Sequence, residues 1–340
     1  MIRIEENISL KHLNTFGLDV KAKYFVEVSS VEILQELIKE PLYMHNKHLI
    51  LGGGSNILFT KDFDGLVIRC SLKGINPLNN DRDTALIEVA SGENWHSLVI
   101  YCIENDYGGI ENLSLIPGTS GAAPIQNIGA YGVEIKDVIT KVDGIDLVTA
   151  TKRSFTSSEC QFNYRESIFK HELKEKFFIS SITLRLTKNK HQLNTHYGAI
   201  QEVLKQQNIE HPTIKNVSDA VIAIRQSKLP DPVIIGNAGS FFKNPTVSVD
   251  EYENIKKTHS SIPSYPFDNQ NVKIPAAWLI EQCGWKGKRI GNIGVHPQQA
   301  LVLVNYGGGN GDEIFNLAMS IQSSVKEKFG IALTTEVNIV

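Results

Sequence analysis

The sequence has no long apolar stretch. Its longest apolar runs, at residues 220–224 and 300–304, are far shorter than the roughly 20 residues that a membrane-spanning helix needs. The first ten residues include Glu5 and Glu6 and lack the apolar centre of a signal peptide. We therefore expect a soluble, cytoplasmic protein that does not act at a membrane.

Cysteine is scarce, and the pairings that bind metals do not occur. The four cysteines, Cys70, Cys102, Cys160 and Cys283, are far apart and form no C-x-x-C pair, and the ten histidines form no H-E-x-x-H. These spacings are the usual signs of zinc binding or thiol exchange. We expect reduced thiols, as in the cytoplasm, and no bound metal.

An excess of positive charge is missing as well. The chain has 34 basic and 37 acidic side chains, a net charge of -3, whereas nucleic-acid-binding proteins usually have a clear basic excess. The length of 340 residues predicts two or three domains. We expect a small-molecule partner, no nucleic acid and a monomeric protein.

Strand-like and helix-like segments alternate along the chain without forming a regular βαβ array. Short β-branched or apolar runs predict strands at residues 24–28, 48–51, 57–60, 66–70, 86–90, 177–186, 300–306 and 331–339, with a hairpin at 138–150. Apolar periodicity and capping residues predict helices from Ser30 to before Pro41, at 94–104, about 198–207, 218–226, from Ser248, at 276–283 and at 312–329. Residues 229–246 hold too many prolines and glycines for regular structure. The pattern indicates an α+β protein.

A first glycine-rich loop, Gly52-Gly53-Gly54-Ser55-Asn56, lies between two apolar strands. Glycines let backbone amides approach a ligand, which is how proteins hold a pyrophosphate. The loop is not a Rossmann fingerprint, because Ile57 takes the place of the third glycine and a strand follows instead of a helix. A phosphate-binding loop and a simple hairpin turn both remain open.

A second loop of small residues extends from Pro117 to Gly132. So many small residues are costly to order as a mere connector, and their amides and hydroxyls suit a phosphate-bearing ligand. A tight crossover between domains is the alternative. Two such loops together favour a bound dinucleotide.

Several motifs in this order resemble the UDP-N-acetylenolpyruvoylglucosamine reductase family of flavin enzymes. The resemblance rests on residues 51–56, 117–132, 164–167, 228–232 and 236–245, and it continues through residues 277–280 and 298–302 to Glu336. It covers nearly the whole chain. The segment His196-Tyr197-Gly198 resembles the tyrosine loop of the longer subtype of this family.

The resemblance implies an α+β protein of three domains. Two would be FAD-binding domains of the non-Rossmann, PCMH-like type, the first formed by residues 1–70 with 332–340 and the second by residues 71–226, which include the tyrosine loop near 190–215. A substrate-binding α+β domain would follow at residues 227–331. FAD would be held by residues of both loops: Gly52, Gly53, Gly54, Ser55, Asn56, Pro117, Gly118, Thr119, Gly121, Ala122, Ile125, Gln126, Asn127, Gly129, Ala130 and Tyr131.

The implied reaction reduces the enolpyruvyl group of UDP-N-acetylenolpyruvoylglucosamine, with NADPH as reductant, to give UDP-N-acetylmuramate for peptidoglycan. By resemblance, Ser240 donates the proton, Arg165 grips the substrate carboxylate, and Glu336 acts beside Arg165. An arginine fork suits a carboxylate better than a lysine does. The substrate contacts would be Tyr197, Lys228, Asn244 and Gln299, with Tyr197 closing over the nucleotide.

Three other interpretations compete with this one. A non-catalytic flavin or nucleotide-sugar binder would not need Ser240, Arg165 and Glu336 together. A flavin oxidase would share the loops but not the residues around Ser240. A hydrolase nucleophile at Ser240 would require glycines at 238 and 242, where alanine and phenylalanine stand.

Overall fold

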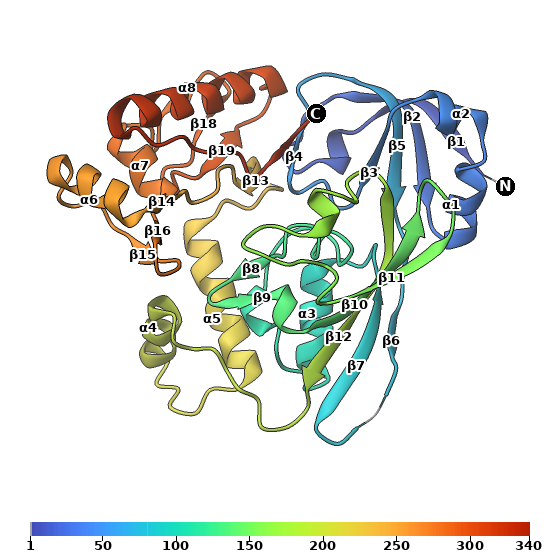
Figure 1. The fold of residues 1–340 in the computed structure, drawn as a ribbon, viewed down its shortest axis with the longest axis horizontal. Coiled ribbons are helices and arrows are strands. Elements are labelled where there is room, and N and C mark those ends of the chain that lie inside the picture. Colours follow the sequence, from blue (N-terminus) through green and yellow to red (C-terminus); the bar gives the residue numbers. More distant parts are fainter. Residues whose placement is uncertain (1, 80) are drawn as a thin grey trace. The chain divides into compact units, whose positions relative to one another are not determined.

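The computed structural model describes residues 2–79 and 81–340. These residues form two compact units that each combine segments far apart in the chain (Figure 1). Unit 1 contains Met1–Ile8, Ala22–Gly53 and Asp64–Ser227, and unit 2 contains Ser9–Lys21, Gly54–Phe63 and Lys228–Val340. Each unit mixes helices and sheets, so the α+β class is confirmed. The division into three domains stays a prediction.

The first sheet of unit 1 has the strand order β1-β2-β5-β3. Its strands are Ile4–Ser9 (β1), Lys21–Val28 (β2), Phe63–Cys70 (β5) and His48–Leu51 (β3). Two short helices, Val31–Leu37 (α1) and Pro41–His45 (α2), lie between β2 and β3 in the chain. The Ser30 hydroxyl caps α1 by accepting from the Ile33 amide. Leu34 and Leu37 of α1 are fully buried in an apolar core that also contains residues of β2 and β5.

The second sheet of unit 1 is antiparallel, with the order β11-β10-β12-β7-β6. Its strands are Lys152–Thr156, Ile139–Asp146, Phe177–Thr187, Thr84–Ala90 and Ile75–Pro77. Alternate residues of β7 are buried, as expected for a strand with one face in the core. The helix α3, Trp95–Glu104, contributes Trp95 and Leu98 to the same core.

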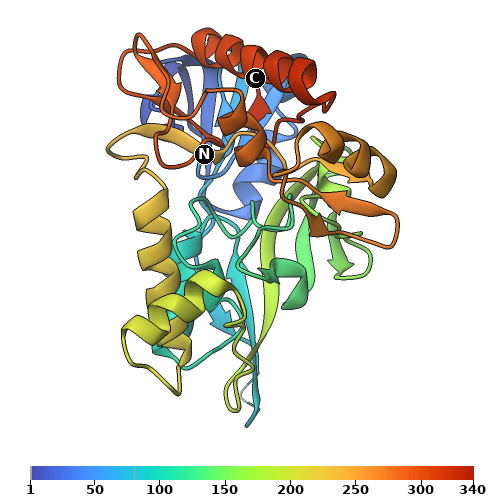
Figure 2. The same cartoon turned by 90° about the vertical axis from the view of Figure 1, so that its left-hand side faces the viewer.

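The helices Gly198–Gln206 (α4) and Ile214–Lys228 (α5) pack on each other in unit 1, as Figure 2 shows. Ile200 and Leu204 of α4 meet Val217 and Val221 of α5 in a small apolar cluster. A short hairpin, Gly129–Ala130 (β8) with Val133–Glu134 (β9), and three short 3-10 helices, Glu111–Leu113, Ile135–Asp137 and Ile168–Lys170, complete the unit.

Unit 2 contains an antiparallel sheet of order β13-β19-β18-β17. These strands are Gly236–Ser240, Val302–Asn305, Ile293–Val295 and Arg289–Ile290. The helix α8, Gly311–Phe329, contacts β18 and β19, and α7, Ala276–Gln282, contacts α8.

The remaining elements of unit 2 are short. A small sheet joins Thr246–Ser248 (β14), Asn271–Lys273 (β16) and Tyr265–Pro266 (β15), and α6, Val249–Thr258, contacts β14. The strand Ile57–Leu58 (β4) pairs in parallel with Asn338–Ile339 (β20). A 3-10 helix, Lys11–Leu13, lies near the amino terminus.

Three predictions of secondary structure were wrong. Residues 229–246 include the strands β13 and β14 despite their glycines, because β13 pairs with the buried strand β19. Only Asn338–Ile339 of the predicted last strand is a strand. The hairpin of β10 and β11 extends to Thr156 rather than ending at 150.

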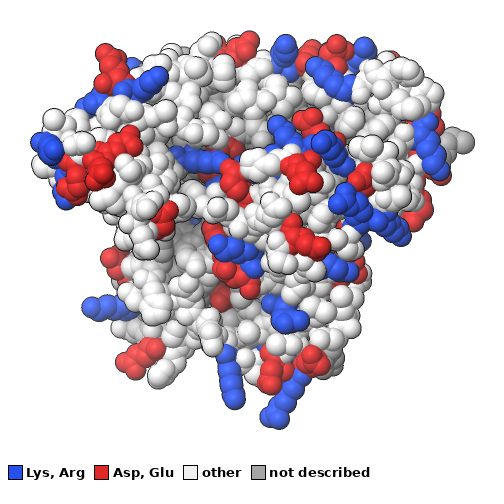
Figure 3. Space-filling view, in the orientation of Figure 1, with Lys and Arg blue, Asp and Glu red and all other residues white. Residues whose placement is uncertain are grey.

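Charges of both signs are interspersed on the face shown in Figure 3, in keeping with the small net charge. Among residues 2–79 and 81–340, no helix combines the length and the apolar character needed to cross a membrane. The same part of the chain contains no group of three or more potential metal ligands.

Candidate active site

The first glycine-rich loop leaves β3 and meets the second loop within unit 1. A Cβ atom on Gly53 would lie 2.9 Å from Cα of Gly118, and one on Gly52 would lie 2.8 Å from Oγ1 of Thr119. The two loops therefore approach each other so closely that only glycine fits at 53 without a shift. Since β3 and β4 belong to different sheets, the loop is not a hairpin turn, and that alternative was wrong.

Backbone donors remain free at this close approach. In the described part of the chain, no residue accepts a hydrogen bond from the amides of Gly53, Gly118 or Thr119. Unpaired amides on two adjacent turns form a cradle for an anion. This arrangement fits the diphosphate of FAD, which these residues would hold.

The second loop packs firmly onto strand β7 and helix α3. The Ser120 hydroxyl donates to the Ala90 carbonyl (2.5 Å) and is buried, the Gly121 amide donates to the Ser91 carbonyl (2.9 Å), and the Trp95 amide donates to the Gly118 carbonyl (3.1 Å). Both ends of the loop lie in unit 1. The loop therefore does not connect the two compact units, and a crossover between domains stays open together with the three-domain division.

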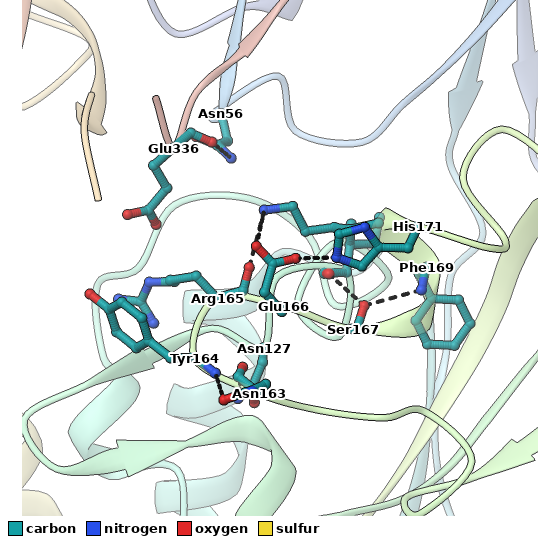
Figure 4. Close-up of polar contacts among 12 residues, drawn as sticks. Asn56, Asn127, Asn163, Tyr164, Arg165, Glu166, Ser167, Phe169, His171 and Glu336 are labelled. Atoms are coloured by element: carbon teal, nitrogen blue, oxygen red, sulfur yellow. Dashed lines mark hydrogen bonds and ion pairs between the residues drawn. The ribbon is translucent and has the colours of Figure 1, made fainter. Parts of the chain in front are cut away.

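The segment around Arg165 is hydrogen-bonded to the second loop at three places, as Figure 4 shows for part of it. The side-chain nitrogen Nδ2 of Asn127 donates to the Asn163 carbonyl (3.0 Å). The Arg165 guanidinium donates to the Gly129 carbonyl (2.8 Å), and the Ser167 hydroxyl donates to the Ile125 carbonyl (2.6 Å). These bonds place Arg165 beside the expected flavin loop.

Asn127 is a structural residue of that loop. Its side chain is fully buried, donates to Glu134 (3.0 Å) and accepts from the Lys136 amide (3.2 Å). Because these bonds already occupy the amide group, any contact of Asn127 with FAD would come from its backbone.

Arg165 has an unusual backbone conformation, with φ of 55°. Few non-glycine residues adopt this left-handed region, and such strain is common at functional sites. Its guanidinium lies 5.5 Å from the centre of the Tyr164 ring. The neighbouring Glu166 bonds to His171 (2.6 Å), so that carboxylate has a partner of its own (Figure 4).

Two tyrosines meet edge to face at the end of the second loop. The rings of Tyr131 and Tyr197 are 5.3 Å apart at an interplanar angle of 83°, an arrangement that aromatic pairs prefer. Burial raises the pKa of Tyr131. Tyr197 precedes α4 and is 54% exposed, so it can still contact a ligand.

Ser240 is the last residue of β13 in unit 2. It pairs with Val302 of β19, and the buried rings of Phe241 and Phe242 follow it. Among the described residues, none forms a hydrogen bond with the Ser240 hydroxyl. The hydroxyl is thus fixed by a strand and still free to interact with a ligand.

Glu336 lies next to this strand end. Its amide donates to the Phe241 carbonyl (2.8 Å), one residue after Ser240. Its carbonyl accepts from the Asn56 side chain (3.2 Å), and Asn338 donates to the Asn56 carbonyl (2.9 Å from Nδ2). Asn56, Glu336 and the end of β13 are therefore neighbours in unit 2 (Figure 4).

Gly54 shows why the loop cannot vary at its centre. Its φ is 62°, and an added Cβ would lie 1.9 Å from the Leu13 carbonyl oxygen. The Thr15 amide donates to the Gly54 carbonyl (3.0 Å). Only glycine can occupy this position.

The predicted substrate residues differ in their surroundings. The Asn244 side chain caps helix α7 by accepting from the Ala276 amide (2.9 Å), and the Gln299 side chain accepts from the Leu301 amide (3.3 Å). Each side-chain amide nitrogen is left for other partners. Lys228 is exposed at the last position of α5.

The predicted site residues are thus distributed over both units. Unit 1 brings together Gly52, Gly53, Pro117, Gly118, Thr119, Gly121, Ala122, Ile125, Gln126, Asn127, Gly129, Ala130, Tyr131, Arg165 and Tyr197. Unit 2 contains Gly54, Ser55, Asn56, Lys228, Ser240, Asn244, Gln299 and Glu336.

The sequence interpretation missed the residues that support Arg165. Asn163 and Ser167 lie close to Arg165 in the chain. They bond to Asn127 and Ile125 of the second loop, which are 36 and 42 positions away in the sequence. Local sequence patterns do not report contacts over such distances.

Two family models match the chain. The FAD binding domain model matches residues 22–153, and the C-terminal domain model of UDP-N-acetylenolpyruvoylglucosamine reductase matches residues 231–340. Among curated proteins, the chain is similar to UDP-N-acetylenolpyruvoylglucosamine reductases of Flavobacterium johnsoniae (51% identity, covering 100% of both chains), Amoebophilus asiaticus (50%, 99% of both) and Chromobacterium violaceum (45%, 98% of both).

A solved structure shares the fold. The crystal structure of UDP-N-acetylenolpyruvylglucosamine reductase from Thermus caldophilus aligns with a TM-score of 0.70 at 21% identity, covering 100% of this chain and 99% of that one.

Proposed function

Because the chain belongs to the UDP-N-acetylenolpyruvoylglucosamine reductase family, we propose that it reduces UDP-N-acetylenolpyruvoylglucosamine to UDP-N-acetylmuramate through the residues described above. It is an FAD-dependent oxidoreductase of peptidoglycan precursor synthesis. When bound, FAD would supply the hydride for this reduction, with NADPH as the reductant. The protein supplies binding, orientation and a proton.

The hydroxyl of Ser240 is the observation that carries the proposal for the proton. Hydride addition at the terminal carbon of the enolpyruvyl group leaves negative charge on the neighbouring carbon and its carboxylate. That carbon must then receive a proton, and Ser240 Oγ is a donor that no described residue binds. The rings of Phe241 and Phe242, which follow Ser240 in the chain, are buried and help to hold this strand end in place.

Arg165 and Glu336 act on the carboxylate in this proposal. The guanidinium of Arg165 binds the substrate carboxylate through two parallel hydrogen bonds. It stabilises the carboxylate more strongly as negative charge develops there in the transition state. Its bond to the Gly129 carbonyl supports this role, because it fixes the orientation of the fork. Glu336 would hold a proton or be paired with a cation when the substrate is bound, since a carboxylate beside an anion is otherwise unfavourable.

The nucleotide end of the substrate carries a diphosphate. We assign its binding to Lys228, Asn244 and Gln299, with Tyr197 covering the nucleotide. The free amide nitrogens of Asn244 and Gln299 and the exposed ammonium of Lys228 support this assignment. The three-domain division, with residues 227–331 as the substrate domain, belongs to the same proposal.

The proposal includes a monomeric enzyme in the cytoplasm. All four cysteines are unpaired, which supports a reducing compartment. Light scattering of the purified protein tests the monomer, and fractionation of cells tests the location.

Replacing Ser240 with alanine tests the chemical role. In Ser240→Ala, reduction of bound FAD by NADPH should proceed, whereas reoxidation by UDP-N-acetylenolpyruvoylglucosamine should slow about 10²–10⁴-fold, the usual contribution of a general acid. Stopped-flow absorbance at the flavin band measures both half-reactions. Ser323→Ala is the matched control, because Ser323 is exposed on α8 and bonds only to the Met319 carbonyl. Unchanged reoxidation in Ser240→Ala would mean that the proton comes from another group.

A further inference from the structure

We propose that Asn112 is a positioning residue that holds Tyr197 in place for binding the substrate. The inference rests on the proposed function, in which Tyr197 covers the nucleotide of the substrate. It adds a residue that neither the motifs nor the family assignment singled out. Asn112 lies in the 3-10 helix Glu111–Leu113 of unit 1 and is only 1% exposed.

One side-chain nitrogen of Asn112 joins two loops that are far apart in the sequence. Its Nδ2 donates to the Tyr131 carbonyl (3.1 Å) and to the Asn194 carbonyl (2.8 Å). Tyr131 lies in the turn of the β8–β9 hairpin, and Asn194 lies in the tyrosine loop, between β12 and α4. Because the nitrogen carries two N–H groups, each loop receives one of them.

Two further contacts connect the same two loops. Nδ2 of Asn194 donates to the Gly132 carbonyl (3.0 Å), and the rings of Tyr131 and Tyr197 meet edge to face at 5.3 Å. A Cβ atom on Gly132 would lie 2.9 Å from Nδ2 of Asn194, so the approach is as close as a glycine allows. The hairpin turn and the tyrosine loop are therefore held together by Asn112, by Asn194 and by the two rings.

The hairpin turn needs this support from outside. Tyr131 and Gly132 have φ values of 50° and 81°, the left-handed conformation that both central residues of a two-residue hairpin turn of this kind adopt. Glycine adopts it without strain, whereas a tyrosine rarely does. The surrounding contacts must compensate for such strain, and the hydrogen bond from Asn112 to the Tyr131 carbonyl is one of them. The direction of the Tyr131 ring, against which Tyr197 packs, thus depends on Asn112.

Helix α4 fixes Tyr197 from its other side. The Tyr197 carbonyl accepts from the Ile200 amide (2.8 Å), and Ile200 is buried in the apolar cluster that α4 forms with α5. The Tyr197 backbone is therefore held between α4 and the bonds of Asn194, three residues earlier, while the residue stays 54% exposed. A side chain that is ordered before the ligand arrives binds more tightly, because its ordering does not oppose binding.

The hydrogen bonds of Asn112 argue against a role in folding alone. Its Oδ1 is buried without a hydrogen bond in the described part of the chain, and an unsatisfied buried acceptor is unfavourable. A leucine would fill a similar volume without this penalty. Tyr131 and Asn194 are only partly buried, so water can reach their carbonyls once Asn112 is replaced. Loss of the amide should release the tyrosine loop rather than unfold unit 1.

A double-mutant cycle tests whether Asn112 acts through Tyr197. In FAD-loaded protein, calorimetry should show that Asn112→Leu weakens binding of UDP-N-acetylmuramate roughly 5- to 50-fold, as expected for the loss of about two hydrogen bonds. In the Tyr197→Ala background, the same change should weaken binding by less than about 2-fold, because the ring that Asn112 positions is gone. Asn105→Leu is the control and should leave binding unchanged, since Asn105 is exposed and its side chain donates to the Tyr101 carbonyl (2.8 Å).

A second variant reaches the same contacts from the tyrosine loop. Asn194→Ala removes the bond to the Gly132 carbonyl at a position that is only partly buried, so it does not disturb the core. It should weaken UDP-N-acetylmuramate binding about 2- to 10-fold when Tyr197 is present and have little effect in the Tyr197→Ala background. If Asn112→Leu failed to fold, this cycle would decide, and additive losses in it would overturn the inference.

The remaining outcomes contradict the inference in distinguishable ways. Unchanged binding in Asn112→Leu would show that Asn112 does not serve the ligand, and additive losses with Tyr197→Ala would show that it acts by another route. Release of FAD from Asn112→Leu would assign Asn112 to the cofactor loop instead. In these cases the unmutated protein still binds UDP-N-acetylmuramate and the proposed function stands, whereas failure of the unmutated protein to bind it would refute both.

Discussion

The close approach of the two glycine-rich loops makes a sharp prediction about Gly53. In Gly53→Ala, the new methyl group would lie 2.9 Å from Cα and 3.3 Å from the carbonyl carbon of Gly118. Both atoms belong to the backbone and cannot rotate away. One of the two loops must therefore move.

The size of the effect follows from these distances. Ordinary contact begins at 3.4 Å, so the loops must separate by about 0.5 Å. Overpacking of this kind costs about 1–3 kcal/mol. Since 1.4 kcal/mol is a factor of ten in an equilibrium constant, FAD binding should weaken roughly 5- to 150-fold if the strain falls on the cradle.

Flavin retention and thermal unfolding measure the two consequences. Gly53→Ala should lose FAD on dilution, seen as released flavin fluorescence. Without FAD, Gly52→Ala should be less destabilised than Gly53→Ala, because its methyl would meet Oγ1 of Thr119, a side-chain atom that can move. Gly198→Ala, with no atom within 4 Å of its added Cβ, is the control and should be neutral or slightly stabilised. Tight FAD binding by Gly53→Ala would refute this account of the cradle.

Two further predictions concern other parts of unit 1. Tyr197→Phe keeps the ring contact with Tyr131 but loses the hydroxyl. Binding of UDP-N-acetylmuramate should therefore weaken about 2- to 10-fold, whereas FAD binding should not change. A loss of FAD affinity in a titration would show that the tyrosine loop contacts the cofactor instead. Asp146 accepts from the Thr149 and Val148 amides and pairs with Arg153, and these contacts lower the pKa of Asp146 to about 2. The stabilising effect of the ionised carboxylate is therefore present above pH 4 and is lost as the pH falls toward 2. Asp146→Asn should unfold at a lower temperature at pH 7 and show less change in unfolding temperature between pH 4 and 2; an unchanged unfolding temperature at pH 7 would contradict this prediction.

Local patterns predicted most elements of the fold. The Ser30 cap and the apolar periodicity of α8 are short-range signals, and both elements begin within a residue or two of the predicted positions. Residues 236–240 carry the opposite signal, because two of the five are glycine. They form β13 since β19 offers a buried partner more than 60 residues later in the chain, and no local rule reports that pairing.

The candidate site residues were predicted for a different reason. They occur in strings whose order resembles a known family, so Ser240, Arg165 and Glu336 could be named without geometry. Asn163 could not be recognised in this way, because its carbonyl accepts from the side chain of Asn127, 36 positions away. Only coordinates reveal such a contact.

The pairing of β4 with β20 joins residues 57–58 to residues 338–339, and unit 2 as a whole is assembled from three separate stretches of chain. As the nascent chain leaves the ribosome, the stretches 9–21 and 54–63 emerge long before residues 228–340, which complete unit 2. Because contacts over such separations form late, Gly54, Ser55 and Asn56 reach their final positions only near the end of synthesis. Secure capture of FAD should accordingly be a post-translational event.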